Sequence, residues 1–241
     1  VYMPQTFTAD GYGYVAEETI LAALAAHPEA KCLLVTRPDF YGCLTSLKRI
    51  AEKAHAQGCR LVVDEAHGAH LPWMTGLESA GALGADAWVQ SCHKTLPSLT
   101  GTAVLHLRNG ADRERAMTLL RLTQTSSPSF VLMMSVDDGR AWMEAYGRER
   151  LTATAQAADA LRARLPELGY GDAHAGWQET GMQFDPTRLV ITAPQGGEAL
   201  DTALRVRGID VEMHDLRRVV CILTAMDDAE TVAQLEAALQ D

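Results

Sequence analysis

The chain has 241 residues, 47% of them hydrophobic, which is enough to form the core of one large domain or of one and a half. Its 31 acidic and 21 basic residues give a formal net charge of −10, and an acidic surface disfavours a nucleic-acid partner because it repels phosphate backbones. No apolar run approaches the roughly 18–20 residues that span a bilayer, and no basic start leads into an apolar segment, so neither a membrane span nor a signal peptide is predicted.

The first 107 residues alternate between helical and strand patterns. Apolar residues at helical spacing predict helices, and short apolar runs closed by turn residues predict buried strands. The expected elements are helices over 17–27, 44–58 (with Gly58 as its C-cap) and 76–85, and strands over 31–36, 60–63, 86–91 and 101–107. Strands that alternate with helices in this way favour right-handed crossovers and a mostly parallel sheet, an α/β fold.

The rest of the chain divides into a helical stretch and a small mixed unit. The stretch from Asp112 to Arg164 is helical in pattern, with possible breaks at Gly139 and Gly147, and its three methionines are expected in the core: Met133, Met134 and Met143. Residues 165–172 mark a plausible boundary, so the predicted domains are 1–165 and a small α+β domain over 172–241. Strands are expected at 187–193, 209–213 and 219–225, and helices at 196–208 and 228–240.

A polar cluster follows directly on the most buried-looking segment. The stretch RLVVDEAHGAHLPW (60–73) leaves its strand at Asp64 and continues through Glu65, His67 and His70. Because parallel sheets bind ligands beyond the carboxyl ends of their strands, we expect this cluster on the ligand-binding edge.

Two other kinds of site are weighed for this cluster and disfavoured. Asp64, His67 and His70 lie three residues apart, as metal ligands on a helix might, but Gly68 and the strand exit favour a loop, and zinc needs three or four supported ligands. The letters VVDEAH also resemble the acid box of DEAH-type helicases, but no phosphate-binding GxxxxGK[ST] loop occurs in these residues.

A lysine one β-α-β step downstream favours a third kind of site. In DAWVQSCHKTLPSLTG, Lys94 lies 94 − 64 = 30 residues after Asp64, at the end of the next expected strand. Adjacent parallel strands are about 4.8 Å apart, so both side chains can approach one small ligand. An amine that forms a Schiff base and a carboxylate that keeps a ring nitrogen protonated suit pyridoxal phosphate.

The same segments resemble a known family. VTRPDFYGCL, VVDEAHGAHL, GADAWVQSCHKTLPSLTGTAVLH and TQTSSPSFVLMMSVDDGRAWM resemble the Orn/Lys/Arg decarboxylases, a bacterial group of fold-type I pyridoxal-phosphate enzymes, from near residue 10 to about Glu149. More weakly, DPTRLVI and GIDVEMHD resemble the C-terminal domain of the shorter, wingless members. The resemblance implies the C-terminal part of an aspartate-aminotransferase-like large domain, followed by a small domain.

The resemblance also implies a role for each matched residue. Lys94 would bond the cofactor, Asp64 would pair with its ring nitrogen, Ala66 would press on one ring face, and His67 would lie beside the ring hydroxyl or the substrate carboxylate. Ser91 and His93 would contact the phosphate. The resemblance also implies a homodimer or a higher homo-oligomer, in which Thr125 and Ser126 would reach the partner's phosphate. The implied reaction is decarboxylation of arginine, lysine or ornithine to an amine.

Plainer interpretations stay open for several of these residues. His67 and His70 could be structural, and His93 could cap a turn. Glu65 could either support a neighbouring site residue or be a solvated acid. Thr125–Ser127 could be a helix N-cap. Tyr41, Glu212 and Asp215 are further candidates for the site.

Other features set limits on the family interpretation. The family's phosphate-binding Ser/Thr-Gly loop and its second ring-stacking residue have no counterpart after Val1, so we expect a fragment of a longer gene, with an open sheet edge. Another fold-type I enzyme, an aminotransferase or an α-oxoamine synthase, and a non-catalytic homologue remain alternatives. Five cysteines without a CxxC pair indicate reduced, buried thiols and a cytoplasmic setting.

Overall fold

A four-stranded sheet forms the centre of the N-terminal part. The computed structural model describes residues 1–108, 113–178 and 181–240. The strand order is β3 (Cys32–Thr36), β5 (Arg60–Asp64), β6 (Ala87–Ser91) and β7 (Ala103–Leu107). The first three are parallel, and β7 is antiparallel to β6 because only a short loop and the four-residue helix α3 (Cys92–Thr95) precede it. The mostly parallel sheet predicted from the sequence is confirmed.

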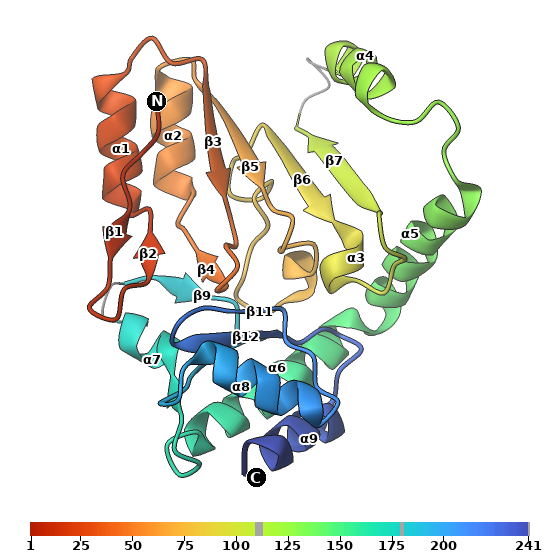
Figure 1. Cartoon of the computed structure of the whole chain (residues 1–241). Coiled ribbons are helices and arrows are strands. Elements are labelled where there is room, and N and C mark those ends of the chain that lie inside the picture. The colour runs from red at the N-terminus through yellow and green to blue at the C-terminus, as the bar shows by residue number, and fades with distance from the viewer. Residues whose placement is uncertain (109–112, 179–180, 241) are drawn as a thin grey trace.

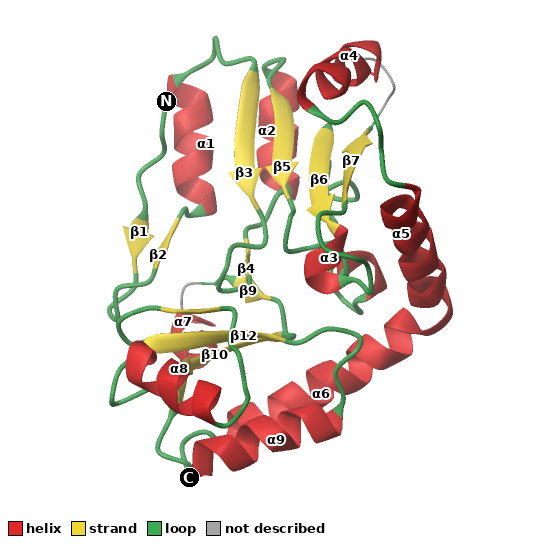
Figure 2. Ribbon diagram, turned by 45° about the vertical axis from the view of Figure 1, so that its right-hand side comes forward, coloured by secondary structure: helices red, strands yellow, loops and turns green. Residues whose placement is uncertain are grey.

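The parallel strands end toward the C-terminal unit. Figure 1 shows their arrowheads directed at that unit, and Figure 2 shows the same relation from a second side. Helices α1 (Glu17–Ala26) and α2 (Lys48–Ala56) pack their apolar residues against Leu33, Leu61 and Val63 on one face of the sheet. On the other face Leu34 is 62% exposed, and β3 pairs only with β5 among the described residues, so β3 is an open edge, as expected.

Two short elements differ from the sequence prediction in this part. The helix expected over 76–85 is wrong: this segment forms turns, with Gly76 and Gly84 at positive φ, and the N–H of Ala80 donates to the Glu65 carboxylate. The helix expected from Leu44 begins at Lys48, because Cys43–Leu44 forms β4, which pairs with β9 (Gln183–Phe184). A 3₁₀ turn, Leu71–Trp73, follows the polar cluster. Gly58, at φ +72°, lies just past α2, as predicted for its C-cap.

A helical arm joins the two parts of the chain. It consists of α4 (Arg113–Thr123), α5 (Phe130–Trp142), a π-helical turn (Met143–Gly147) and α6 (Arg148–Arg164). Asp112, where this stretch was expected to begin, lies outside the described residues. Gly139 does not interrupt α5, whereas Gly147 ends the π-helical turn. Met143 is buried as predicted, but the prediction is wrong for Met133 and Met134, which are 46% and 63% exposed.

The C-terminal unit is a small antiparallel sheet with helices. Its strands run in the order β11 (Met213–His214), β12 (Arg218–Ile222), β10 (Arg188–Thr192) and β8 (Gly171–Asp172). The helices are α7 (Ala173–Trp177), α8 (Gly197–Val206) and α9 (Ala229–Gln240). The strand expected over 209–213 is wrong, because Ile209 and Val211 pack against the core from irregular chain and pairing starts only at Met213.

Three remaining observations complete the fold. A short hairpin, β1 (Thr6–Phe7) with β2 (Gly13–Tyr14), lies near the N-terminus. All five cysteines are free; four are buried, but Cys32 is exposed, contrary to the expectation for it. Within the described residues, no helix has the length and apolar character that crossing a membrane requires.

Candidate active site

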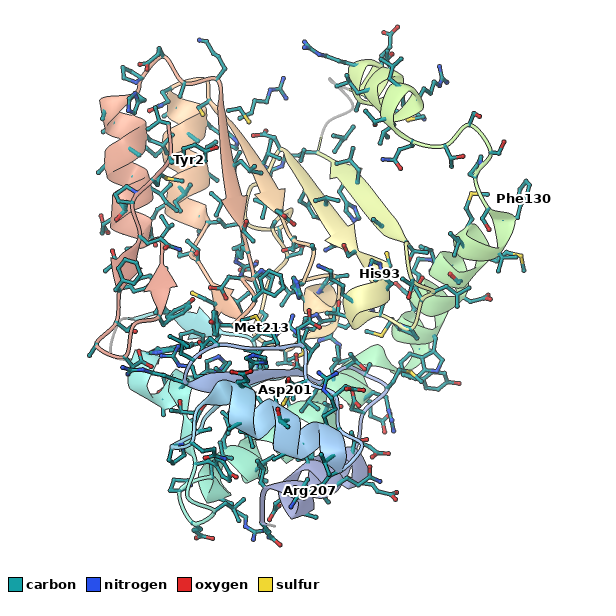
Figure 3. The ribbon with its side chains drawn as sticks, viewed as in Figure 1. Tyr2, His93, Phe130, Asp201, Arg207 and Met213 are labelled. Carbon is teal, nitrogen blue, oxygen red and sulfur yellow. The ribbon has the colours of Figure 1, made fainter. Side chains whose placement is uncertain are left out.

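The candidate residues lie at the edge where the parallel strands end. Asp64 is the last residue of β5 and Ser91 the last of β6, and these neighbouring strands pair in parallel register. Helix α3 starts at the next residue and carries His93 and Lys94. Figure 3 shows His93 below the end of β6, on the side of the sheet that meets the C-terminal unit. The strand ends therefore bring residues far apart in sequence to one edge.

Lys94 and His67 form the centre of the site. The Lys94 Nζ lies 3.1 Å from the His67 Nε2, although the two residues are 27 positions apart. The Phe40 ring contacts the imidazole, with 4.7 Å between centroids, and the Lys94 Nζ is 5.9 Å from the Phe40 centroid. His67 is only 4% exposed, whereas Lys94 is half-buried. The amine thus lies against a buried imidazole, while Lys94 itself stays partly accessible.

Local hydrogen bonds fix the residues around this pair. The Asp64 Oδ1 accepts a 3.1 Å hydrogen bond from the backbone N–H of Ala66, which holds the carboxylate and places Ala66 directly beside it. The His93 Nδ1 lies 2.9 Å from the backbone oxygen of Thr102, so one ring nitrogen is used by the loop before β7. This contact supports the turn-capping interpretation of His93 and leaves its second ring nitrogen for a ligand.

The imidazole of His67 is held neutral. Burial, the largest cause, and the positive charge of Arg188 together lower its pKa to about 3, while Asp185 acts in the opposite direction. Arg188 is itself fully buried, and its Nη2 lies 3.2 Å from the His67 Nδ1. Arg188, a buried residue of the C-terminal unit, therefore contacts the ring nitrogen of His67 that does not face Lys94.

Glu65 and His70 face away from the reactive pair. Glu65 is completely buried, and its carboxylate accepts hydrogen bonds from Ala80 N and Gln90 Nε2; burial raises its pKa to about 6. His70 Nε2 lies 3.0 Å from Asp185 Oδ2. Although burial alone would raise the pKa of Asp185, His70 and Arg188 lower it overall. Both residues support the loop, so the solvated alternative for Glu65 is wrong, and His67 and His70 do not converge on a shared ligand.

Thr125 and Ser126 lie on the arm, exposed, between α4 and α5. The Thr125 Oγ1 accepts from Ser127 N at 3.1 Å. The N-cap of α5 is Ser129, whose hydroxyl accepts from Leu132 N, so the N-cap interpretation of 125–127 is wrong.

Four further residues bear on the interpretation from sequence. Tyr41 donates to Asp215 at 2.8 Å, so these two candidates contact each other. Sequence reasoning missed Phe40 and Arg188. Phe40 is an aromatic residue in an exposed turn, and Arg188 is an arginine at the start of an apolar strand, a position where a charge needs a buried partner.

The donor set fits pyridoxal phosphate. An amine on α3 and a carboxylate at the end of the adjacent strand can flank one flat ring, and Ala66 is small enough for a ring to lie against it. A hydroxyl and an imidazole, Ser91 and His93, adjoin the lysine and suit a phosphate group. Among the described residues, no group of three or more metal-binding side chains is found.

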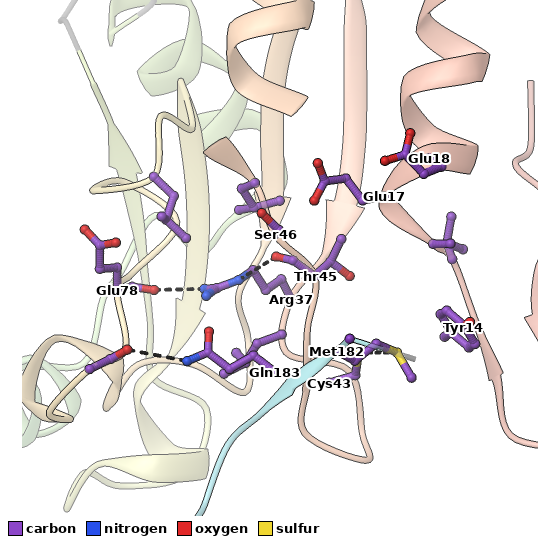
Figure 4. A pocket seen from close by; sticks show the side chains of 17 residues that line it. Tyr14, Glu17, Glu18, Arg37, Cys43, Thr45, Ser46, Glu78, Met182 and Gln183 are labelled. Carbon is purple, nitrogen blue, oxygen red and sulfur yellow. Dashed lines mark hydrogen bonds between the residues drawn. The ribbon is translucent and has the colours of Figure 1, made fainter. Parts of the chain in front are cut away.

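A separate cavity of about 470 Å³ lies at the start of α1. Figure 4 shows it between Glu17, Arg37, Glu78 and Gln183. Arg37 donates to the backbone oxygens of Thr45 and Glu78 there, so its charge is used structurally. Neither Lys94 nor His67 lines this cavity, and it is distinct from the candidate site.

The chain is similar to known proteins both in sequence and in structure. The family model described as Orn/Lys/Arg decarboxylase, major domain, matches residues 12–183. An arginine decarboxylase of Halalkalibacterium halodurans is 33% identical over 234 residues, 93% of this chain and 48% of the relative. The lysine decarboxylase of Francisella novicida has a TM-score of 0.79 at 17% identity, covering 99% of this chain and 41% of that one.

A third likeness is to the structure of SPT with its PLP internal aldimine. Its TM-score is 0.69 at 20% identity, covering 92% of this chain and 57% of that one. The solved structures show the fold, that of the fold-type I pyridoxal-phosphate enzymes, which confirms the fold expected from the sequence. The chain spans about half of the length of the curated relatives it matches.

Proposed function

The chain belongs to the Orn/Lys/Arg decarboxylase family, and on this premise we propose that its site binds pyridoxal phosphate and serves the decarboxylation of a basic amino acid: arginine, lysine or ornithine. The single observation that carries the proposal is the Lys94 amine held 3.1 Å from His67 at the strand edge where Asp64 also lies. The family match supports the reaction class.

Each residue of the site has a defined task in this proposal. Lys94 would bond the cofactor, Asp64 would face its ring nitrogen, Ala66 would lie against the ring, and Ser91 and His93 would hold the phosphate. When bound, pyridoxal phosphate supplies a ring that withdraws the electron pair left by the departing CO₂. The Asp64 carboxylate, which accepts the Ala66 N–H, would help to keep a proton on the ring nitrogen of the bound cofactor. His67, buried and neutral, excludes water from one side of Lys94 and orients its amine.

A second copy of the chain is part of the proposal. Thr125 and Ser126 would reach the partner's phosphate, as the family resemblance implies. Their exposure on the arm supports this role, because it leaves them accessible to a second copy. Exposed apolar residues on both flanking helices, including Leu122, Phe130 and Met134, are suited to an interface between copies.

Covalent attachment of the cofactor to Lys94 is the first test. The chain is incubated with pyridoxal phosphate, reduced with borohydride and digested, and the modified lysine is located by mass spectrometry. We expect modification at Lys94 and its loss in Lys94→Ala, whereas Lys53→Ala, which removes an exposed lysine of α2, should keep it. Modification that spreads over the exposed lysines and survives Lys94→Ala would refute the cofactor assignment.

Product analysis separates the reaction classes. Arginine, lysine and ornithine are supplied in turn, and CO₂ and amines are measured beside keto acids. Release of CO₂ with one amine supports decarboxylation and identifies the substrate, whereas a keto acid would indicate an aminotransferase instead.

A further inference from the structure

Arg188 links the C-terminal unit to the reactive pair. It is the first residue of β10, is completely buried, and reaches His67 across 121 positions of sequence. Its Nη2 lies 3.2 Å from the His67 Nδ1 and 3.3 Å from the His67 backbone oxygen. This nitrogen carries two hydrogens, one for each acceptor. Nε and Nη1 are buried without an acceptor among the described residues, so the polar contacts of the guanidinium are made to His67.

The surrounding chain is shaped to hold the arginine in this position. Gly42, at φ +86°, lies beside its stem: a Cβ there would lie 2.5 Å from the Arg188 Cγ, so any side chain would displace it. The backbone oxygen of Arg188 accepts a hydrogen bond from Arg162 on α6, and its N–H donates to Asp185 O. The guanidinium therefore has little freedom to turn away from the imidazole.

The donors and acceptors allow one arrangement of protons on His67. A guanidinium has only donors, so the Nδ1 that faces Arg188 must accept and be without hydrogen. The single proton of the neutral ring then lies on Nε2, 3.1 Å from the Lys94 Nζ. An N–H that points at this amine can only donate to its lone pair. An ammonium in the same place would set donor against donor.

We propose that Arg188 is a positioning residue that fixes His67 as its Nε2–H tautomer, and that His67 thereby holds Lys94 as the free amine. The free amine is the form that attacks a carbonyl, so the arrangement prepares Lys94 for its bond to the cofactor. The purpose given to the free amine, its bond to the cofactor, rests on the proposed function. The tautomer of His67 does not, because it follows from contacts within the chain.

The charges around His67 support a neutral ring. Burial is the main obstacle to a second proton on the ring, and Arg188 from β10 and His70 from the same loop act in the same direction. The amine of Lys94, from α3, faces the same ring. Asp185, before β10, is the acid that favours protonation, but it lies 3.0 Å from His70 and its charge is shared there. The neutral tautomer is therefore expected across the range in which the protein is folded.

Nitrogen NMR of the chain labelled with ¹⁵N-histidine reads the tautomer directly. His67 is assigned by the signal that disappears in His67→Gln, and no cofactor is added. We expect a pyrrole-type Nε2 and a pyridine-type Nδ1 from pH 5 to pH 8. A proton on Nδ1, or on both nitrogens at pH 7, would overturn the proposal even if every variant below failed to fold.

Variants of Arg188 test whether it is the cause. In Arg188→Met the Nδ1 loses its donor, so His67 should show both tautomers, and Arg188→Lys should restore most of the Nε2–H form. A merely structural role would change stability without changing this pattern. A single Nε2–H tautomer in a folded Arg188→Met chain would show that Arg188 does not select it.

Acylation of Lys94 gives the second readout. The rate of acetylation by acetic anhydride at pH 7 is followed by mass spectrometry relative to the exposed Lys31, Lys48 and Lys53. In Arg188→Met the relative rate at Lys94 should fall several-fold, because a bare Nε2 favours the ammonium, and Arg188→Lys should recover it. An unchanged rate would refute the step from His67 to Lys94. Failure of cofactor binding would instead refute the proposed function and leave the tautomer and acylation results standing.

Discussion

His67 is the residue whose proton affinity folding changes most visibly in the site. A histidine in the unfolded chain has a pKa of about 6.5, and burial lowers the pKa of His67 to about 3 in the folded chain. Between these values the unfolded chain binds a proton that the folded chain does not. Acid therefore favours unfolding, and the free energy of unfolding should fall as the pH drops from about 6.5 toward about 3.

Removal of His67 should flatten this dependence. The limiting slope for one such group is roughly 1.4 kcal/mol per pH unit, so the wild type should lose more stability than His67→Gln between pH 7 and pH 5. Urea denaturation at pH 7, 6 and 5 measures the difference. Glu65, whose raised pKa gives a dependence of the opposite sign, is common to both proteins and cancels. Parallel pH profiles for the two proteins would contradict the burial of a neutral imidazole.

The sequence could predict part of the site, residue by residue. Asp64 and Lys94 were identifiable because Asp64 ends one apolar strand and Lys94 lies in the short helix that follows the next strand, which are local patterns. Arg188 was not, because its role depends on a contact made only when the two parts of the chain pack together, and Phe40 was not, because its ring contact with His67 is a tertiary contact within the N-terminal part. Arg188 reads as an ordinary strand residue until His67, 121 positions away, is found beside it.

At the scale of elements, α5 packs closely against the loop that follows α3, the helix that carries Lys94. Ser135 of α5 lies 3.2 Å from the Ser98 Oγ and accepts from Leu99 N. Gly139, one turn further along α5, allows the helix to approach so closely that a Cβ there would lie 2.6 Å from the Pro97 backbone oxygen. A backbone atom cannot move aside as a flexible side chain can.

Gly139→Ala should therefore separate α5 from the loop. We expect a loss of about 1–3 kcal/mol in the free energy of unfolding, the usual cost of overpacking, although alanine favours helices. Gly176→Ala in α7 is the matched control, because its added Cβ would meet nothing within 4 Å, and it should be neutral or slightly stabilising. Chemical denaturation measures both. Equal effects of the two substitutions would show that the close approach does not matter.

The helices and strands could be predicted where their buried residues recur periodically. The prediction failed where contacts with distant residues determine the backbone conformation. The strands of the central sheet and helices α1, α8 and α9 follow from their own apolar patterns. The segment 76–85 has helical spacing, but it forms turns. The Ala80 N–H of this segment donates to the carboxylate of Glu65, which lies 15 positions earlier in the chain. The alternation over 209–213 reflects packing against the core, not strand pairing.

At the scale of the whole molecule, the N-terminal sheet and the C-terminal unit have separate hydrophobic clusters and meet at the candidate site. The β4–β9 pair and the contact of Arg188 with His67 cross between them. The arm leaves this arrangement: Figures 1 and 3 show α4 and the start of α5, marked by Phe130, standing clear of both sheets. Phe130 is 77% exposed and Leu122 is 76% exposed, as is typical of a surface that another chain covers.

A charge on the arm should disrupt the proposed homodimer. Met134 is a 63% exposed apolar residue of α5, and Met134→Asp would place a carboxylate in the interface, where a buried unpaired charge is costly. We expect the dissociation constant, measured by sedimentation equilibrium, to rise at least about tenfold, which corresponds to about 1.4 kcal/mol. Leu216→Asp is the control: Leu216 is 93% exposed on the C-terminal unit, away from the arm, and its substitution should leave association unchanged. A wild-type chain that stays monomeric at high concentration, or two variants that weaken association equally, would show that the arm is not the interface.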